Sequence, residues 1–184
     1  MIKSVITYGL LLVLALSVGK VKAQQYTEYD LKAAYIYNFS KFVNWPSSSF
    51  EDESDDFEIV VYGSSPITEV LYKALKNRKI RGRSISIKVI YDLKNLGDAE
   101  ILFVSKDMQK DIKNIVNICE GSPILIIGDI LEGFCQSGGI INFTQKSSKY
   151  RFEINNQAAQ RAGLKISSKL LALARIVSSE EIKF

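Results

Sequence analysis

Short apolar runs of strand character alternate with segments of helical spacing through the middle of the chain, and this alternation limits the possible folds more than any other feature. The strand-like runs read FEIVVYG, SISIKVIY, AEILFVS, SPILIIGD, GGIINFT and YRFEIN. Helical patterns separate several of them, as in SSPITEVLYKALKN and MQKDIKNIVNIC. Because such alternation makes strands parallel and places helices over the sheet, the sequence predicts a single-domain α/β fold. We expect a three-layer sandwich with a mainly parallel sheet, helices on both faces, and an antiparallel edge strand from the last hairpin.

The first 23 residues have the composition of a secretory signal peptide. A lysine lies near the start, a largely apolar run extends over residues 5–18, and Ala23 is a small residue suited to cleavage. We therefore expect a leader at residues 1–23 and an α/β domain at residues 24–184, located in the periplasm and not itself spanning the membrane once the leader is removed. The leader holds three lysines and no acid, so its removal lowers the formal net charge from +4 to +1. A nearly neutral domain argues against a nucleic-acid partner, whose phosphates require a concentrated basic surface.

The aromatic-rich segment LKAAYIYNFSKFVNWP, residues 31–46, predicts a helix that ends before its proline. Helical spacing turns about half of the circumference toward the core. The predicted inward positions are Leu31, Tyr35, Ile36, Phe39, Phe42 and Val43. Tyr37 and Trp45 are not assigned to this stripe, and we interpret them as candidate contacts with a partner protein, because exposed aromatic rings contribute strongly to binding energy.

Three further segments bear on surfaces. In YRFEIN, Arg151 and Glu153 alternate with apolar residues, so we expect them to point outward and either contact a partner or pair with neighbouring strands. SSKLLALARIVSS predicts a final helix that is apolar nearly all round and must be covered by the domain or by another subunit, so a homodimer is one expected assembly. The basic KNRKIRGR, residues 76–83, is offset in charge by the acidic loop SSSFEDESDD, and we interpret it as a solvated connector.

The sequence lacks residues on which most catalytic sites depend. It has no histidine, which removes the commonest general base and the most frequent metal ligand. We therefore predict no enzymatic activity, no cofactor and no metal site. An alternative function is that of a small-ligand sensor or carrier. Its polar groups would be Ser64 and Ser65 in the loop YGSSPIT, and Asp129 at the end of SPILIIGD.

Cys119 and Cys135 are the two cysteines, and both lie in the part expected to be exported, where an oxidising compartment favours pairing. A disulfide between them would close a loop of about 16 residues and contribute about 3 kcal/mol. Two buried, unpaired thiols are the alternative. The cysteines can meet only if DILEGFCQ returns toward the edge of the sheet near Cys119, which would make GGIINF parallel to PILIIG.

Several of these segments together resemble one family of periplasmic proteins, the YfiR family. They are KAAYIYNFSKFVNWP, AEILFVS, PILIIGD followed by GFCQSGGIINF, and YRFEINNQAAQRAGLKISSKLLALARIV. The resemblance runs from about residue 31 to residue 177, and its most specific part is the final block.

The resemblance implies a regulator that acts by binding. The best-known member of the family associates with the periplasmic part of an inner-membrane diguanylate cyclase and holds it inactive until stress relieves the block, with disulfides that help to keep it folded. A similar role is expected here in cyclic di-GMP signalling. Ala99 stands where the family usually has a cysteine ahead of ILFV, so an arrangement with two disulfides is not possible.

Overall fold

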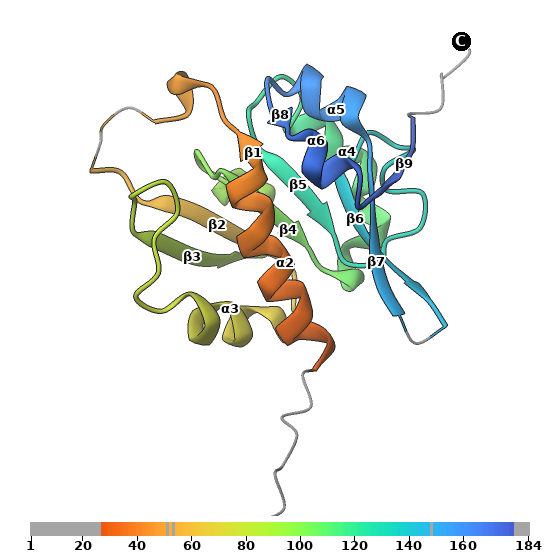
Figure 1. Ribbon diagram of the computed structural model, residues 1–184, viewed down its shortest axis with the longest axis horizontal. Coiled ribbons are helices and arrows are strands. Elements are labelled where there is room, and N and C mark those ends of the chain that lie inside the picture. Colours follow the sequence, from red (N-terminus) through yellow and green to blue (C-terminus); the bar gives the residue numbers. More distant parts are fainter. Residues whose placement is uncertain (1–26, 51, 53, 148, 179–184) are drawn as a thin grey trace, which may run out of the picture.

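The computed structural model describes residues 27–50, 52, 54–147 and 149–178 (Figure 1). The expected leader, residues 1–23, lies outside this part of the chain. A seven-stranded sheet has the strand order β3-β2-β4-β5-β6-β7-β9. Its strands are β2 (Phe57–Tyr62), β3 (Ile85–Ile90), β4 (Ile101–Val104), β5 (Leu125–Gly128), β6 (Ile141–Lys146), β7 (Lys149–Ile154) and β9 (Arg175–Ile176). A small antiparallel sheet pairs β1 (Val43–Asn44) with β8 (Lys165–Ile166).

The large sheet is mainly parallel. Strands β3, β2, β4, β5 and β6 run parallel to their neighbours, whereas β6 and β7 form an antiparallel hairpin. Every residue of β4 and β5 is buried, as expected for strands covered on both faces. Figure 1 shows α2 (Glu28–Phe42) and α3 (Ile67–Leu75) in front of the sheet and α4 (Ile112–Ile118) behind it. The predicted α/β sandwich is therefore confirmed. Strand β6, which begins within GGIINF, pairs in parallel with β5, the direction that a pairing of Cys119 with Cys135 would require.

Helix α2 packs across the front of the sheet by a narrow buried stripe. The helix starts with a capping box, in which Thr27 and Asp30 each accept a hydrogen bond from the other's backbone N–H. It ends at Phe42 because the next two residues extend to pair with β8. Its buried positions are Lys32, Ala33, Ile36, Phe39 and Ser40. The predicted inward positions Leu31 and Phe42 are wrong, since these side chains are 37% and 38% exposed.

The end of the chain differs from the predicted final helix. Helix α5 (Asn156–Arg161) is followed by β8, by the one-turn helix α6 (Ser168–Leu171), and then by β9. Strand β9 pairs in parallel with the last two residues of β7, so backbone hydrogen bonding at the edge of the sheet replaces the second half of the helix. The continuous apolar helix on which the homodimer argument rested is therefore absent from the described residues, and the homodimer stays a prediction.

Candidate functional site

The carboxyl ends of the parallel strands meet at the edge where open α/β sheets usually bind ligands. The chain leaves β2 toward β3 on one side and then returns to β4 on the other, so the strand order reverses between β2 and β4. Gly63 follows β2 with φ +92, and a Cβ there would lie 2.6 Å from an oxygen of Asp107. Asp107 also accepts a hydrogen bond from the Ser64 N–H at 3.0 Å. The Asp107 carboxylate therefore packs against the turn after β2, where the strand order reverses.

The predicted ligand-binding serines hold this turn. Ser64 is exposed and contributes its backbone N–H to Asp107. The Ser65 hydroxyl accepts a hydrogen bond from the Ile67 N–H at 3.3 Å, at the start of α3. Ser64 as a donor and Ser65 as an acceptor thus both stabilise the turn between β2 and α3.

Asp129, the third predicted ligand group, belongs to a buried ionic network that also contains Glu28, Lys32, Lys106 and Tyr150. Lys32 is 0% exposed and donates to both Asp129 and Glu28. The Tyr150 hydroxyl donates to Glu28 at 2.8 Å, and the Lys106 ammonium lies 3.5 Å from Glu28. Two ammonium groups thus face two carboxylates, and the charges balance inside the network. Because Asp129 is 1% exposed and paired, the structure does not present it to a ligand.

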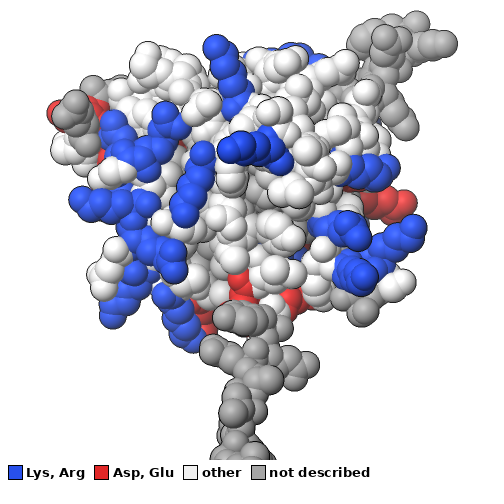
Figure 2. All heavy atoms as spheres, in the orientation of Figure 1, with Lys and Arg blue, Asp and Glu red and all other residues white. Residues whose placement is uncertain are grey.

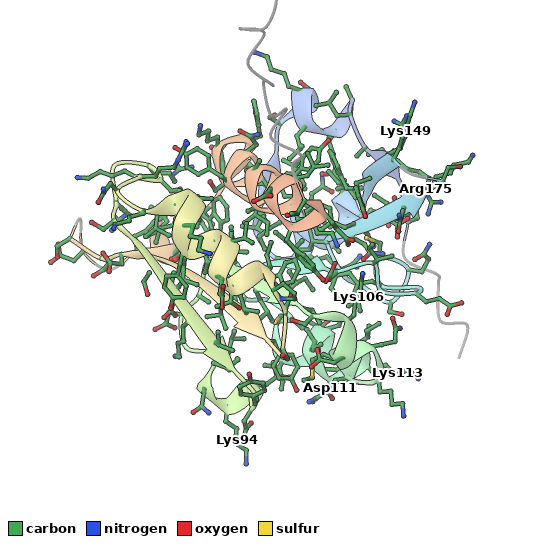
Figure 3. All side chains as sticks on the ribbon, turned by 90° about the horizontal axis from the view of Figure 1, so that it is seen from below. Lys94, Lys106, Asp111, Lys113, Lys149 and Arg175 are labelled. Carbon is green, nitrogen blue, oxygen red and sulfur yellow. The ribbon has the colours of Figure 1, made fainter. Side chains whose placement is uncertain are left out.

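Titration behaviour follows from these contacts. Burial acts to raise the pKa of Glu28, but the hydrogen bonds from Lys32 and Tyr150 outweigh it, so the pKa is lowered. Burial and the Asp129 carboxylate raise the pKa of Tyr29, whose ring lies 4.9 Å from the Lys32 ammonium. Figure 3 views this edge from below, with Lys106 between α2 and the labelled residues Asp111 and Lys113.

Two cavities lie away from these predicted ligand residues. One of about 1240 Å³ lies beside α4 and α5 and is lined by Cys119, Ile126 and Ile140 among others. The other, of about 500 Å³, has acidic side chains around it, including Glu58, Asp98 and Glu100. Among the described residues, no group of three or more His, Cys, Asp or Glu side chains is placed to hold a metal ion.

Glu100 is the buried acid of the smaller cavity. It is 4% exposed and accepts a hydrogen bond from the Glu58 N–H at 2.6 Å. Burial raises the pKa of Glu100 from 4.5 to about 7. Between these two values the folded chain holds a proton that the unfolded chain releases, so this group lowers stability as the pH rises through that window.

We expect the substitution Glu100→Gln to stabilise the protein by about 2–3 kcal/mol above pH 7, because it removes the buried charge and keeps an oxygen for the Glu58 N–H. Chemical unfolding at several pH values between 4 and 8 measures this. The variant and the original chain should converge near pH 4, where the carboxyl group is protonated in both states. A constant difference at every pH would contradict the role assigned to the charge.

The two cysteines are free, buried thiols in the structure. Burial raises the pKa of Cys119 to about 11 and raises that of Cys135 further, so neither forms a reactive thiolate at neutral pH. The Cys135 thiol lies 3.7 Å from the carbonyl oxygen of Ile140, to which it donates. The pairing of Cys119 with Cys135 is not formed in the structure and stays a prediction.

The predicted partner contacts have different environments. Trp45 is 6% exposed, packs edge-to-face on Phe57 with ring centroids 5.2 Å apart, and donates to the Glu100 carbonyl oxygen at 3.3 Å. Its predicted exposure is wrong, because the chain turns inward after α2 and carries the indole into the core. Arg151 is exposed, as expected.

Glu153 does not point outward into solvent. It is 3% exposed, accepts a hydrogen bond from Arg175, and lies 3.3 Å from the side-chain nitrogen of Asn142. Pairing with a neighbouring strand, the alternative that the sequence left open, is the arrangement found. The reason is that β9 lies beside β7 and supplies the arginine.

Tyr37 lies at the surface, where two positively charged side chains contact its ring. Its ring is half-buried, with the Lys41 ammonium 3.9 Å and the Arg78 guanidinium carbon 4.9 Å from its centroid. A hydrogen bond with Arg78 lowers the pKa of Tyr37. We call the basic face the set of five exposed side chains made up of the two that contact this ring, Lys41 and Arg78, and three other exposed cations of the adjoining connector, Lys76, Lys79 and Arg81. Figure 2 shows Lys and Arg side chains gathered on this side of the molecule, over α3 and the connector to β3.

The connector within the basic face has a defined turn. Ile80 and Arg83 exchange two backbone hydrogen bonds, of 3.1 and 2.9 Å, across Arg81 and Gly82. Both central residues have positive φ, 53 and 84, as in the type I′ turn of a hairpin. A side chain with a Cβ costs about 1–2 kcal/mol in this region. Arg81 offsets part of that cost through its hydrogen bond to the Asn44 side-chain oxygen at 3.3 Å.

Sequence reasoning did not identify Lys32 or the geometry of the basic face. Lys32 could have been found, because it lies at helical spacing with Ile36 and Phe39 and so falls on the buried stripe. The Arg81-Gly82 turn gives a weaker signal, because arginine is not typical of a type I′ turn.

The described domain has buried acids that are paired or hydrogen-bonded, protonated thiols, and an exposed surface of cationic and aromatic side chains. The exposed cationic and aromatic side chains form a surface of the kind that binds other molecules. The chain belongs to the YfiR/HmsC-like family, whose model matches residues 29–175. The resemblance inferred from the sequence is thus confirmed. Members of this family are, in general, periplasmic regulators of cyclic di-GMP signalling. None of the curated proteins compared with the chain matches it.

Proposed function

We propose that this chain is exported to the periplasm and represses an inner-membrane signalling enzyme of the diguanylate cyclase type by binding its periplasmic part. The observation that carries the proposal is the family match, which spans residues 29–175 and therefore nearly all of the described domain. None of the helices among the described residues has the length and apolar character needed to cross a bilayer.

A protein of this kind regulates its target enzyme by binding to it. A regulator changes an enzyme only through different affinities for its active and inactive states. Reducing an evenly balanced enzyme to about 1% active requires an affinity ratio of about 100, or about 2.7 kcal/mol. A contact surface of a few well-placed side chains can supply a difference of that size.

The test is the level of cyclic di-GMP in the source bacterium. Deletion of the gene should raise this level, measured with a fluorescent biosensor, and expression of the full chain should restore it. A chain without residues 1–23 should fail to restore it, because it stays in the cytoplasm. The matched control is the same deletion in a strain that also lacks the cyclase, in which no rise is expected.

Two outcomes would overturn the proposal. An unchanged cyclic di-GMP level after deletion would remove the repressor role. Full restoration by the chain without its leader would place the activity in the cytoplasm.

A further inference from the structure

We propose that the basic face docks onto an acidic segment of a partner protein. This inference rests on the proposed function only for the identity of the partner. The surface itself is argued from charge and geometry.

Positive charge is strongly segregated on this side of the domain. Residues 70–91 contain seven lysines and arginines and no acid, although the domain without its expected leader is nearly neutral. Residues 31–49, which form most of α2 and the turn after it, also contain no acid. The segment that sequence reasoning interpreted as a solvated connector thus lies beside a helix that adds Lys41 to it.

Within the described part of the chain, carboxylates do not pair with the five cations of the basic face. The acidic loop was expected to offset the connector, but Arg83 reaches it only through the backbone carbonyl oxygens of Asp52 and Asp55. Lys73 has an exposed ion pair with Glu69 at 3.8 Å. Among the residues that the structure describes, no ion pair within 4.0 Å joins a member of the basic face to a carboxylate.

Three of the five cationic groups, Lys41, Arg78 and Arg81, are held in place before any partner binds. Lys41 and Arg78 come from different elements and converge on the single ring of Tyr37. Arg81 is fixed by the type I′ turn and by its hydrogen bond to Asn44. Like charges held close together repel each other, so an incoming carboxylate relieves repulsion while it forms new hydrogen bonds. Groups fixed in advance lose little conformational entropy on binding.

The fixed geometry favours a protein partner over a lipid surface. Anionic membranes attract lysine and arginine largely through the number of charges near the surface. An arginine held in one orientation instead suits bidentate contact with a single carboxylate. Half-buried Tyr37 and exposed Phe42 add aromatic area beside the cations, and tyrosine and arginine are the residues enriched in the energetic centres of protein interfaces. The occupant is therefore assigned as a segment rich in Asp and Glu.

The probe is a fluorescein-labelled dodecapeptide of glutamate, with a glutamine dodecapeptide as its neutral control. Protein purified after expression of the full chain should bind the glutamate peptide in a fluorescence anisotropy titration, and added salt should weaken the binding. The paired substitution Lys41→Gln and Arg78→Gln should reduce the affinity about tenfold or more.

The substitution Arg81→Asn tests the effect of losing one positive charge without a loss of stability. It creates an Asn-Gly sequence, which is the preferred type I′ turn, so the fold is retained or stabilised while one cation is lost. We expect peptide affinity to fall about threefold with no loss of thermal stability. The matched control is the pair Lys113→Gln and Lys149→Gln, which removes two exposed charges away from the basic face (Figure 3) and should leave the affinity nearly unchanged.

The outcomes distinguish the possible partners. Equal weakening by the face and control pairs would mean attraction by overall charge and would overturn the inference. Binding to vesicles containing one third phosphatidylglycerol, lost in the Lys41 and Arg78 pair, without binding of the glutamate peptide, would assign the face to membrane and also overturn it. If the glutamate peptide fails to bind while gene deletion still raises cyclic di-GMP, the docking inference falls and the proposed function stands.

Discussion

Replacing Lys32 with methionine is expected to destabilise the protein by about 3–5 kcal/mol. Methionine matches the length of the aliphatic part but leaves Asp129 buried without its cation, and an uncompensated buried charge is far costlier than a lost surface pair. Glu28 is less affected, because it retains Tyr150 and Lys106. Urea unfolding of both chains at pH 7 measures the difference.

A double substitution gives the control. Adding Asp129→Asn to Lys32→Met removes the orphaned charge and should recover part of the loss, so the two changes are strongly non-additive. Lys106→Met is the matched single change. Its ammonium side chain is 49% exposed, and removal should cost about 1 kcal/mol or less. A cost of similar size at positions 32 and 106 would contradict the central position of Lys32 in the network.

Trp45→Ala is expected to destabilise the protein by about 3–5 kcal/mol, as for other large aromatic residues removed from a core. The indole is 6% exposed and packs on Phe57, so truncation leaves a cavity between the end of α2 and β2. Any loss of partner capture in this variant should therefore accompany unfolding. Thermal unfolding followed by circular dichroism measures the stability, and capture is compared only below the melting temperature.

Two further substitutions separate the contributions of Trp45. Trp45→Phe keeps an aromatic ring but loses the hydrogen bond to the Glu100 carbonyl, and should cost about 1–2 kcal/mol. Tyr91→Ala removes a 68% exposed ring and should change stability by about 0.5 kcal/mol or less. A Trp45→Ala protein as stable as the original chain, yet unable to bind its partner, would show that the indole acts as a surface contact after all.

The regular part of the fold could be predicted from the sequence because its signals are local. Continuous apolar runs such as ILFV and LIIG specify strands covered on both faces, and the structure buries every residue of both. The parallel direction of β6 was expected only as the condition for Cys119 to meet Cys135, and β6 has that direction although the two thiols are not paired in the structure. The family resemblance, too, rested on contiguous blocks of residues.

The remaining features depend on contacts between distant residues. The C-terminal segment has helical spacing, but pairing of Arg175 with Glu153 on β7 outweighs it in the last residues. Helix α2 ends at Phe42, earlier than predicted, and Trp45 lies beyond it. The direction of the Trp45 side chain could therefore not be obtained from the helical period. Helical spacing places Lys32 on the buried stripe of α2, but its partner is a carboxylate 97 residues away, which no local pattern identifies.

If the chain is exported as proposed, the buried network of Lys32, Glu28 and Asp129 also affects the order of folding events. Helix α2 is the first described element of the chain, yet its buried Lys32 pairs with Asp129, 97 residues away, and its Glu28 accepts a hydrogen bond from Tyr150, 122 residues away. Closing contacts of such long separation is slow compared with forming local structure. In a chain that crosses a membrane from its amino end, the leading helix must wait for the trailing half to emerge. The ionic contacts that fix α2 on the domain therefore form only after the last third of the polypeptide has crossed.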